Sequence, residues 1–229
     1  MDKIKKITNK NGKGQEQRSE ESRARILNSA TKIFAKKGPQ GSRVDEIAED
    51  AGINKRMLYH YFGNKEDLYV EVLRLNYNKI FTLGKNAFRL GDDPRENVTR
   101  AIRAYFYFLA ENEAFVRLTS WEALNGGRYV KKVISQYFDL VELEFGDIIK
   151  DGIKRKFIKP DTDFRQVLLS VQALCLAYFN RLEMVQPLWQ EDMLSKGMLE
   201  ARLQHILDLI FNGIFSHKEA MNNGCFSEN

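Results

Sequence analysis

The sequence predicts an all-α protein, with a small N-terminal three-helix domain of the helix-turn-helix type and a larger C-terminal helical domain. Only four prolines and 15 glycines interrupt 229 residues, and no sustained alternation of apolar and polar residues indicates a strand. Apolar residues recur instead at helical spacing along most of the chain. Because 43% of the residues are hydrophobic and 29% are charged, the chain can bury a substantial core, which excludes disorder throughout.

The first 18 residues are polar and rich in lysine, and we expect them to form a flexible basic arm. No apolar run follows this basic start, so no secretory signal is expected. The most apolar stretch, residues 167–179, is shorter than the roughly 20 residues that span a bilayer. Two cysteines cannot build a disulfide framework. These features predict a soluble, cytoplasmic protein with no membrane partner.

Two short helices are expected between residues 22 and 51. The apolar positions of the first form one stripe: Ile26, Leu27, Ala30, Ile33 and Phe34. Gly38-Pro39 should end it. The second helix should begin at Ser42, because Ser42 to Asp45 resembles a capping box, and it should end at Gly52.

A third helix should follow after a short turn, with Asn54 as its N-cap and Gly63 after its end. Its inward side chains are expected to be Met57, Leu58, Tyr61 and Phe62. The second and third helices then form a helix-turn-helix.

The outward face of this third helix is rich in hydrogen-bond donors: Asn54, Lys55, Arg56, Tyr59 and His60. Arginine can reach guanine and asparagine can pair with adenine in the major groove, while lysine and tyrosine suit phosphates. Residues 51–65 contain no Asp or Glu, and residues 1–65 hold 15 basic and 8 acidic residues against 21 and 23 in the remainder. This charge distribution favours contact with a polyanion over the alternative, an ordinary solvated surface.

The remainder predicts longer helices. They are expected near residues 64–83, 94–109, 113–124, 129–149, 164–185 and 194–215. The expected organisation is therefore an arm over residues 1–18, a helix-turn-helix domain over 19–66, a helical domain over 67–216 and a flexible tail over 217–229.

Three segments of the first 73 residues resemble the tetracycline-repressor (TetR) family of transcriptional regulators. Arg25 to Leu27, with Phe34-Ala35-Lys36-Lys37-Gly38, looks like the family's first helix. Residues 44–55 (VDEIAEDAGINK) are similar to its second helix and turn, and residues 58–68 (LYHYFGNKEDL) match its recognition helix and the following cap. Spacing and identity agree over about 50 residues.

The resemblance implies that Lys55, Arg56, Tyr59 and His60 touch DNA. It further implies that Ser42, Arg43 and Lys65 meet phosphates. Two departures from the family pattern stand out: Arg56-Met57 replaces a small Gly-Thr pair, and Arg43 occupies a position that is commonly small and polar. We therefore expect a base preference that differs from that of commoner members.

A single helix in one groove buries too little surface for tight specific binding. A homodimer on a palindromic operator would present two such helices about 34–36 Å apart. Residues 164–185 and the last helix are apolar enough to form a four-helix interface, which the resemblance favours over the alternative, core within one chain.

The resemblance also implies a small-molecule effector, which binds in the C-terminal domain and moves the fourth helix. Aromatic residues of the middle helices are candidates for lining its site: Phe106, Trp121, Tyr137 and Phe138. Aromatic residues at helical spacing are also ordinary core residues, so this alternative stays open.

The sequence argues against catalysis, a metal site or a cofactor. Three histidines and two cysteines are scattered, and no nucleophile elbow, phosphate loop or Cys-x-x-Cys motif occurs. Three classes of function remain. The first is a ligand-responsive DNA-binding regulator, which in this family is most often a repressor; the second is a DNA-bound adaptor whose C-terminal domain binds a protein. The third is a helical enzyme with an incidental basic head.

Overall fold

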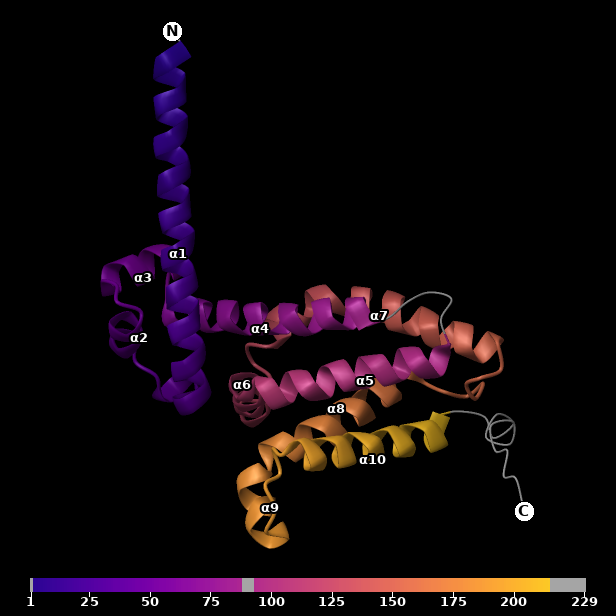
Figure 1. Cartoon of the computed structure of the whole chain (residues 1–229). Helices are drawn as coiled ribbons and strands as arrows, with labels where there is room; N and C mark the ends of the chain where they lie inside the picture. Colours follow the sequence, from indigo (N-terminus) through magenta and orange to yellow (C-terminus); the bar gives the residue numbers. More distant parts are fainter. Residues whose placement is uncertain (1, 88–92, 215–229) are drawn as a thin grey trace, which may run out of the picture. The chain divides into compact units, whose positions relative to one another are not determined.

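The computed structural model describes residues 2–87 and 93–214, with side chains for all of these except 2–14, 136, 138–145, 148 and 214. Within these ranges the chain forms helices and no strand, which confirms the all-α prediction (Figure 1). The helices are α1 (Asp2–Gly41), α2 (Val44–Asp50), α3 (Lys55–Phe62), α4 (Lys65–Ala87), α5 (Pro94–Glu111), α6 (Glu113–Leu124), α7 (Lys131–Lys154), α8 (Phe164–Asn180), α9 (Leu182–Trp189) and α10 (Lys196–Ile214). The tail predicted over residues 217–229 lies outside the described residues.

The helices divide into two compact units that are not contiguous in sequence. The N-terminal unit comprises residues 1–76 and 117–133, and the C-terminal unit comprises residues 77–116 and 134–229. The sequence predicts a single boundary between residues 66 and 67. The division differs because the first half of α4 and residues 117–124 of α6 belong to the same unit as the helix-turn-helix. The prediction of a flexible arm over residues 1–18 differs as well, because α1 begins at Asp2 and includes these residues.

The core of the N-terminal unit is formed where α2 packs against α1 and α3 (Figure 1). Phe34 of α1, Ile47 of α2 and Leu58 of α3 are fully buried there. The Phe34 ring meets Tyr69 of α4 edge to face, with the ring centroids 4.9 Å apart. Burial of such side chains is the main stabilising contribution in a unit of this size. The stripe predicted on the first helix is therefore the one that packs.

Gly38 interrupts α1 at the predicted stop. Its φ of 71° and ψ of 171° are non-helical, and Pro39 follows directly. These angles are accessible almost only to glycine, because a Cβ atom would clash with the backbone. A Cβ at Gly38 would also lie 2.9 Å from the indole ring of Trp121. The turn between α1 and α2 therefore requires glycine on two grounds.

The C-terminal unit is built on three helices that pack on one another: α5, α8 and α10 (Figure 1). Phe106 of α5 and Leu203 of α10 are fully buried, and Phe179 of α8 lies with its ring centroid 5.0 Å from that of Phe106. The short helix α9 contacts α8. None of the side chains on α9 is buried, so this helix adds little to the core of the unit.

Candidate nucleic-acid interface

Helix α3 begins and ends where the sequence predicts. Asn54 is its N-cap, and its side-chain Oδ1 accepts a hydrogen bond of 2.8 Å from the backbone N–H of Arg56. At the other end the N–H of Gly63, whose φ is 74°, donates to the carbonyl of Tyr59 at 2.8 Å. Such caps satisfy backbone groups that a helix of only eight residues would otherwise leave unpaired.

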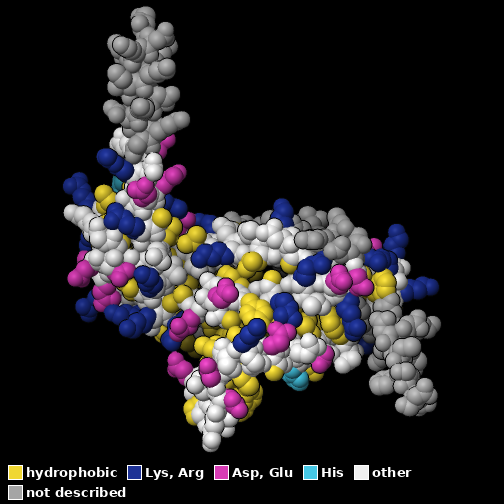
Figure 2. Space-filling view, in the orientation of Figure 1, with side chains coloured by type: hydrophobic (Ala, Val, Ile, Leu, Met, Phe, Trp, Pro, Cys, Tyr) yellow, Lys and Arg dark blue, Asp and Glu magenta, His cyan; other side chains and the backbone are white. Residues whose placement is uncertain are grey.

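The outer face of α3 is open to solvent. Lys55, Arg56 and His60 are exposed, and the Tyr59 side chain is 42% exposed. Figure 2 shows lysine and arginine side chains gathered over the part of the N-terminal unit that carries α2 and α3, with some acidic side chains among them. Helix α3 has an arginine, a lysine, a tyrosine and a histidine on its surface and no carboxylate of its own.

Lys55 is not entirely free for a ligand, because its Nζ lies 2.7 Å from Oδ1 of Asp45 in α2. The hydrogen bond to Asp45 raises the pKa of Lys55 above its ordinary value, so the ammonium group stays charged at neutral pH. Asp45 is highly exposed and lies at the start of α2, which places a carboxylate beside the cationic surface. Residues 51–65 contain no acidic residue, but the fold brings the Asp45 carboxylate next to them.

Three further residues expected at phosphates occupy different environments. Ser42 is only 3% exposed and its hydroxyl donates to the carbonyl of Gly38 at 2.6 Å, so it neither caps α2 nor faces solvent. Arg43 takes the N-cap position of α2 and is exposed. Lys65 is half-buried, and its ammonium group donates to the backbone carbonyl of Ser42 at 3.2 Å. We therefore leave the Ser42 side chain out of the interface.

The prediction that Met57 points inward is wrong, since its side chain is 41% exposed. Leu58 and Phe62, four residues apart, are buried and form the inward seam of α3. Met57 precedes Leu58 by one residue and is thus rotated by about 100° around the helix. A flexible apolar side chain therefore joins the polar groups of the exposed face.

Contacts from α1 hold α2 and α3 in place. The Arg23 guanidinium lies over the ring of Phe62, 5.3 Å from its centroid, and pairs with Glu71 of α4 at 2.7 Å. Lys37 pairs with Glu46 of α2 at 2.8 Å, and this hydrogen bond holds the pKa of the Glu46 carboxyl below its usual value. Each pair is partly exposed, so the contacts fix orientation more than they add stability.

The predicted effector-lining residues are divided between the two units. Phe106 is fully buried in the C-terminal unit, and the Tyr137 ring stacks on Phe81 of α4 at a centroid distance of 4.0 Å. The side chain of Phe138 lies outside the described residues. Trp121 belongs to the N-terminal unit, where its indole N–H donates to the carbonyl of Ala35 at 3.1 Å.

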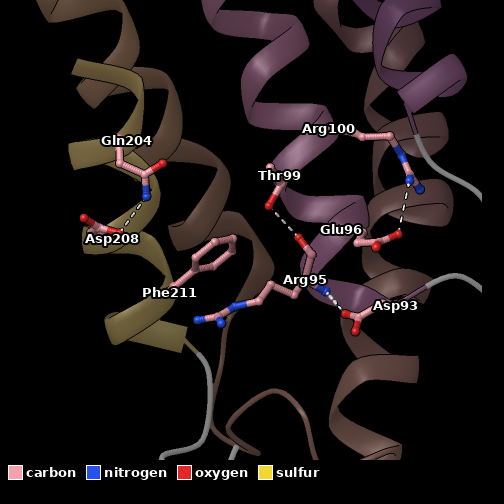
Figure 3. A pocket seen from close by; sticks show the side chains of 8 residues that line it. All are labelled: Asp93, Arg95, Glu96, Thr99, Arg100, Gln204, Asp208 and Phe211. Atoms are coloured by element: carbon pink, nitrogen blue, oxygen red, sulfur yellow. Dashed lines mark hydrogen bonds and ion pairs between the residues drawn. The ribbon is translucent and has the colours of Figure 1, made fainter. Parts of the chain in front are cut away.

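A groove of about 590 Å³ lies between α5 and α10, and none of the predicted effector residues lines it. Figure 3 shows charged side chains of both signs around it, including Arg95 and Asp208 on opposite helices. The Arg95 guanidinium lies over the Phe211 ring, 4.5 Å from its centroid. Because this groove is open and its charges are mixed, it differs from the apolar site that the sequence predicts.

The described residues contain no group of three or more His, Cys, Asp or Glu side chains that could hold a metal ion. Over the same residues, no helix is both long and apolar enough to cross a bilayer.

Sequence comparison identifies the family of this helix-turn-helix protein. Residues 26–72 match the family described as "Bacterial regulatory proteins, tetR family", and residues 94–210 match "Tetracyclin repressor-like, C-terminal domain". The chain belongs to the TetR family. Residues 26–72, which run from α1 into α4, form the family's helix-turn-helix domain. The resemblance seen in residues 25–68 is confirmed.

The similar proteins include both transcriptional repressors and a transcriptional activator. The repressor NicS of Pseudomonas putida is 28% identical over 203 residues, which cover 86% of this chain and 94% of NicS. The activator FasR of Mycolicibacterium smegmatis is 31% identical over 108 residues, covering 47% of this chain and 49% of FasR. The solved structure of KstR2 from Mycobacterium tuberculosis, a ketosteroid transcriptional regulator, aligns with a TM-score of 0.64 at 22% identity, over 85% of this chain and 95% of its own.

These matches show a DNA-binding transcriptional regulator. The family and these relatives are regulators and not enzymes, so the third alternative, a helical enzyme, finds no support. The comparisons also give no support to the adaptor alternative.

Proposed function

We propose that this TetR-family protein is a homodimeric repressor, which binds a palindromic operator through α3 and leaves it when a small apolar or aromatic effector binds the C-terminal unit. The exposed face of α3 carries the proposal. Arg56, Tyr59 and His60 project from a capped, braced helix of the length that fits the major groove. NicS, a repressor, and KstR2, a ketosteroid regulator, support repression and an apolar effector.

Exposure supports most of the proposed DNA contacts. Arg56 and His60 would reach base edges, whereas the exposed Arg43, Lys55 and Tyr59 would meet phosphates, as would the half-buried Lys65 at the start of α4. Asn54 is exposed but already caps α3, so its side-chain oxygen is committed to the helix. Selection of bound fragments from random DNA tests the proposal. An inverted repeat with half-sites about one helical turn apart is expected, and a single unrepeated site would argue against a dimer.

Asp45→Asn is expected to strengthen DNA binding by about two- to fivefold at low salt, because the substitution removes a carboxylate that pairs with Lys55 beside the cationic surface. Binding isotherms at several salt concentrations measure both the affinity and its salt slope. Glu111→Gln, an equal change of charge at an exposed position at the end of α5, is the control. Equal effects of the two substitutions would mean that net charge, not this carboxylate, sets the affinity.

The dimer interface that we propose uses α8 and α10. Leu169 of α8 is 60% exposed and Leu209 of α10 is 48% exposed, while the opposite side of α8 is buried within the chain by Cys175 and Phe179. Helix α8 thus has a buried side for the core and, on its exposed side, Leu169 for a partner. A large exposed apolar surface is costly unless another molecule covers it.

Replacing Leu169 and Leu209 together by Asp is expected to give a folded monomer, because two charges per chain would be buried in the proposed interface. Light scattering after size-exclusion chromatography gives the mass, and circular dichroism checks the helix content. Leu124→Asp, at a leucine of α6 that is 79% exposed, serves as the matched control. A double variant that stays dimeric would place the interface elsewhere.

For the effector, we propose the interior of the C-terminal unit near Phe106 and Tyr137, and with them Phe138. Trp121 is left out, since its ring and N–H group are engaged with α1. Addition of candidate effectors to the protein–operator complex tests this part, with release of DNA as the expected result. Binding that leaves the complex intact would refute the role of the ligand as an inducer.

A further inference from the structure

Two buried hydrogen-bonding groups in the C-terminal unit have no hydrogen-bond partner among the described residues. They are the hydroxyl of Tyr105 in α5 and the Nε of Arg202 in α10, and both are inaccessible to solvent. The amide of Gln172 lies close enough to Tyr105 to act on its hydroxyl, but without the geometry of a hydrogen bond. Unpaired buried donors are rare because they cost free energy, and each therefore calls for an explanation.

Both groups neighbour the same side chain, Cys175 of α8. The thiol acts electrostatically on Tyr105, and Arg202 acts on the thiol. Cys175 is fully buried. Three helices that pack on one another, α5, α8 and α10, thus place a phenol and a guanidinium near the same buried thiol, and Arg202 bonds to the carbonyl of Leu174, the residue before Cys175.

Arg202 lacks a counter-charge. Over the described part of the chain, no carboxylate pairs with it: its terminal nitrogen donates to the backbone carbonyl of Leu174 at 2.8 Å. Its guanidinium lies 5.8 Å from the centroid of the Tyr178 ring. The neighbouring Glu200 is already bound by Arg103, through two hydrogen bonds of 2.9 and 3.0 Å. A partly buried arginine is stabilised by an anion, and its own surroundings do not supply one.

The two acidic groups nearby are neutral at physiological pH. Burial raises the pKa of the Cys175 thiol to about 12, and burial also raises the pKa of the Tyr105 phenol far above its usual value. Neither can serve as the counter-ion of Arg202, whereas a protonated phenol can donate a hydrogen bond. The position therefore offers one positive charge and two donors to an incoming acceptor.

The surroundings are otherwise apolar and aromatic. The Phe106 ring lies 5.0 Å from that of Phe179 and 6.0 Å from that of Tyr178, measured between centroids. Ligand sites combine such walls with a few convergent polar groups. We propose that the effector is a carboxylic acid with an apolar body, whose carboxylate accepts hydrogen bonds from Arg202 Nε and the Tyr105 hydroxyl. This inference rests on the proposed effector response and specifies the chemistry of its site.

Matched pairs of acids and amides test the proposal on the full-length protein without DNA. The probes are benzoate, phenylacetate, octanoate and decanoate, each with its primary amide, and the melting temperature and direct calorimetric binding are measured. At least one acid should stabilise the protein while its amide, equal in shape but uncharged, does not. Equal shifts for acid and amide, or no shift with any acid, would overturn the proposal and leave the two donors to bound water.

Substitutions locate the binding. Arg202→Met should weaken binding of the acid about 100-fold, and Tyr105→Phe about tenfold. Tyr105→Phe should not lower the melting temperature of the ligand-free protein, because it removes a buried hydroxyl that has no partner. If Arg202→Met folds poorly, the acid affinity of Tyr105→Phe still tests the assignment. Arg181→Met, at an exposed arginine between α8 and α9, is the control. Unchanged acid affinity in both site variants would refute the assignment.

The same preparations, assayed for operator binding, separate the two proposals. An acid that stabilises the protein, in a chain that fails to bind any operator, would refute the DNA-level function and leave the acid site standing. Operator binding without any response to acids would refute the acid site and leave the DNA-level function standing.

Discussion

Replacing Arg56 by Ala is expected to abolish sequence-specific operator binding while the fold and the oligomeric state stay intact. The Arg56 side chain is exposed on α3, and no residue in the described ranges pairs with it. A bidentate arginine–guanine contact contributes about 1–3 kcal/mol of discrimination, and a symmetric dimer makes the contact twice. Operator affinity should therefore fall by about 2–6 kcal/mol, while the weak binding of unrelated DNA changes little.

Fluorescence anisotropy with an operator duplex and a scrambled duplex measures both affinities. Tyr59→Phe is the graded companion, because it keeps the ring and removes one donor, and Arg181→Ala supplies an exposed arginine of the other unit as control. If Arg56→Ala and Arg181→Ala weaken both duplexes equally, Arg56 contributes only charge and the reading of bases lies elsewhere on α3.

The sequence predicts the recognition helix well because its determinants are local. The Asn54 cap, the stop at Gly63 and the burial of Leu58 and Phe62 all follow from spacing within one short segment. Met57 is the exception, since periodicity of so few residues does not separate the centre of an apolar stripe from its edge. Helix boundaries are local in the same sense and agree to within a few residues over most of the chain.

Contacts between distant segments could not be predicted in this way. Ser42 has the residue type of a cap, but its hydroxyl is bound by the carbonyl of Gly38 because the turn after α1 folds back onto it. Likewise, Asp45 approaches Lys55 only after α2 and α3 pack. Neither pairing leaves a mark in hydrophobic periodicity, so the sequence does not show that Ser42 is buried or that Lys55 faces a carboxylate.

Trp121 illustrates the same limit at longer range. The sequence indicates only an aromatic residue on a helical stripe, which fits a ligand site and a core equally. In the structure it packs against Gly38, 83 residues earlier in the chain, while Glu122 beside it accepts hydrogen bonds from the backbone N–H groups of Tyr129 and Val130 at 3.0 and 2.8 Å. The end of α6 is thereby fixed within the N-terminal unit.

Gly38→Ala is expected to destabilise the protein by about 2–6 kcal/mol, which is a large fraction of the stability of a typical domain. Two independent costs add. The backbone at φ 71° and ψ 171° strains any residue with a Cβ by about 1–3 kcal/mol. The new methyl group would lie 2.9 Å from the Trp121 ring and would push it off the turn, at about 1–3 kcal/mol for overpacking.

Urea denaturation measures the change, and Gly41→Ala is the matched control. A Cβ at Gly41 meets only the Cβ of Lys37, at 3.6 Å, so this substitution should cost far less. A cycle with Trp121→Ala then separates the two costs, since removal of the ring relieves the clash but not the backbone strain. Gly38→Ala should therefore remain destabilising in the Trp121→Ala background, by a smaller amount. If it costs nothing there, packing alone fixes the turn and the positive φ carries no strain; if its cost is unchanged, the ring moves freely and α6 is not anchored through this contact.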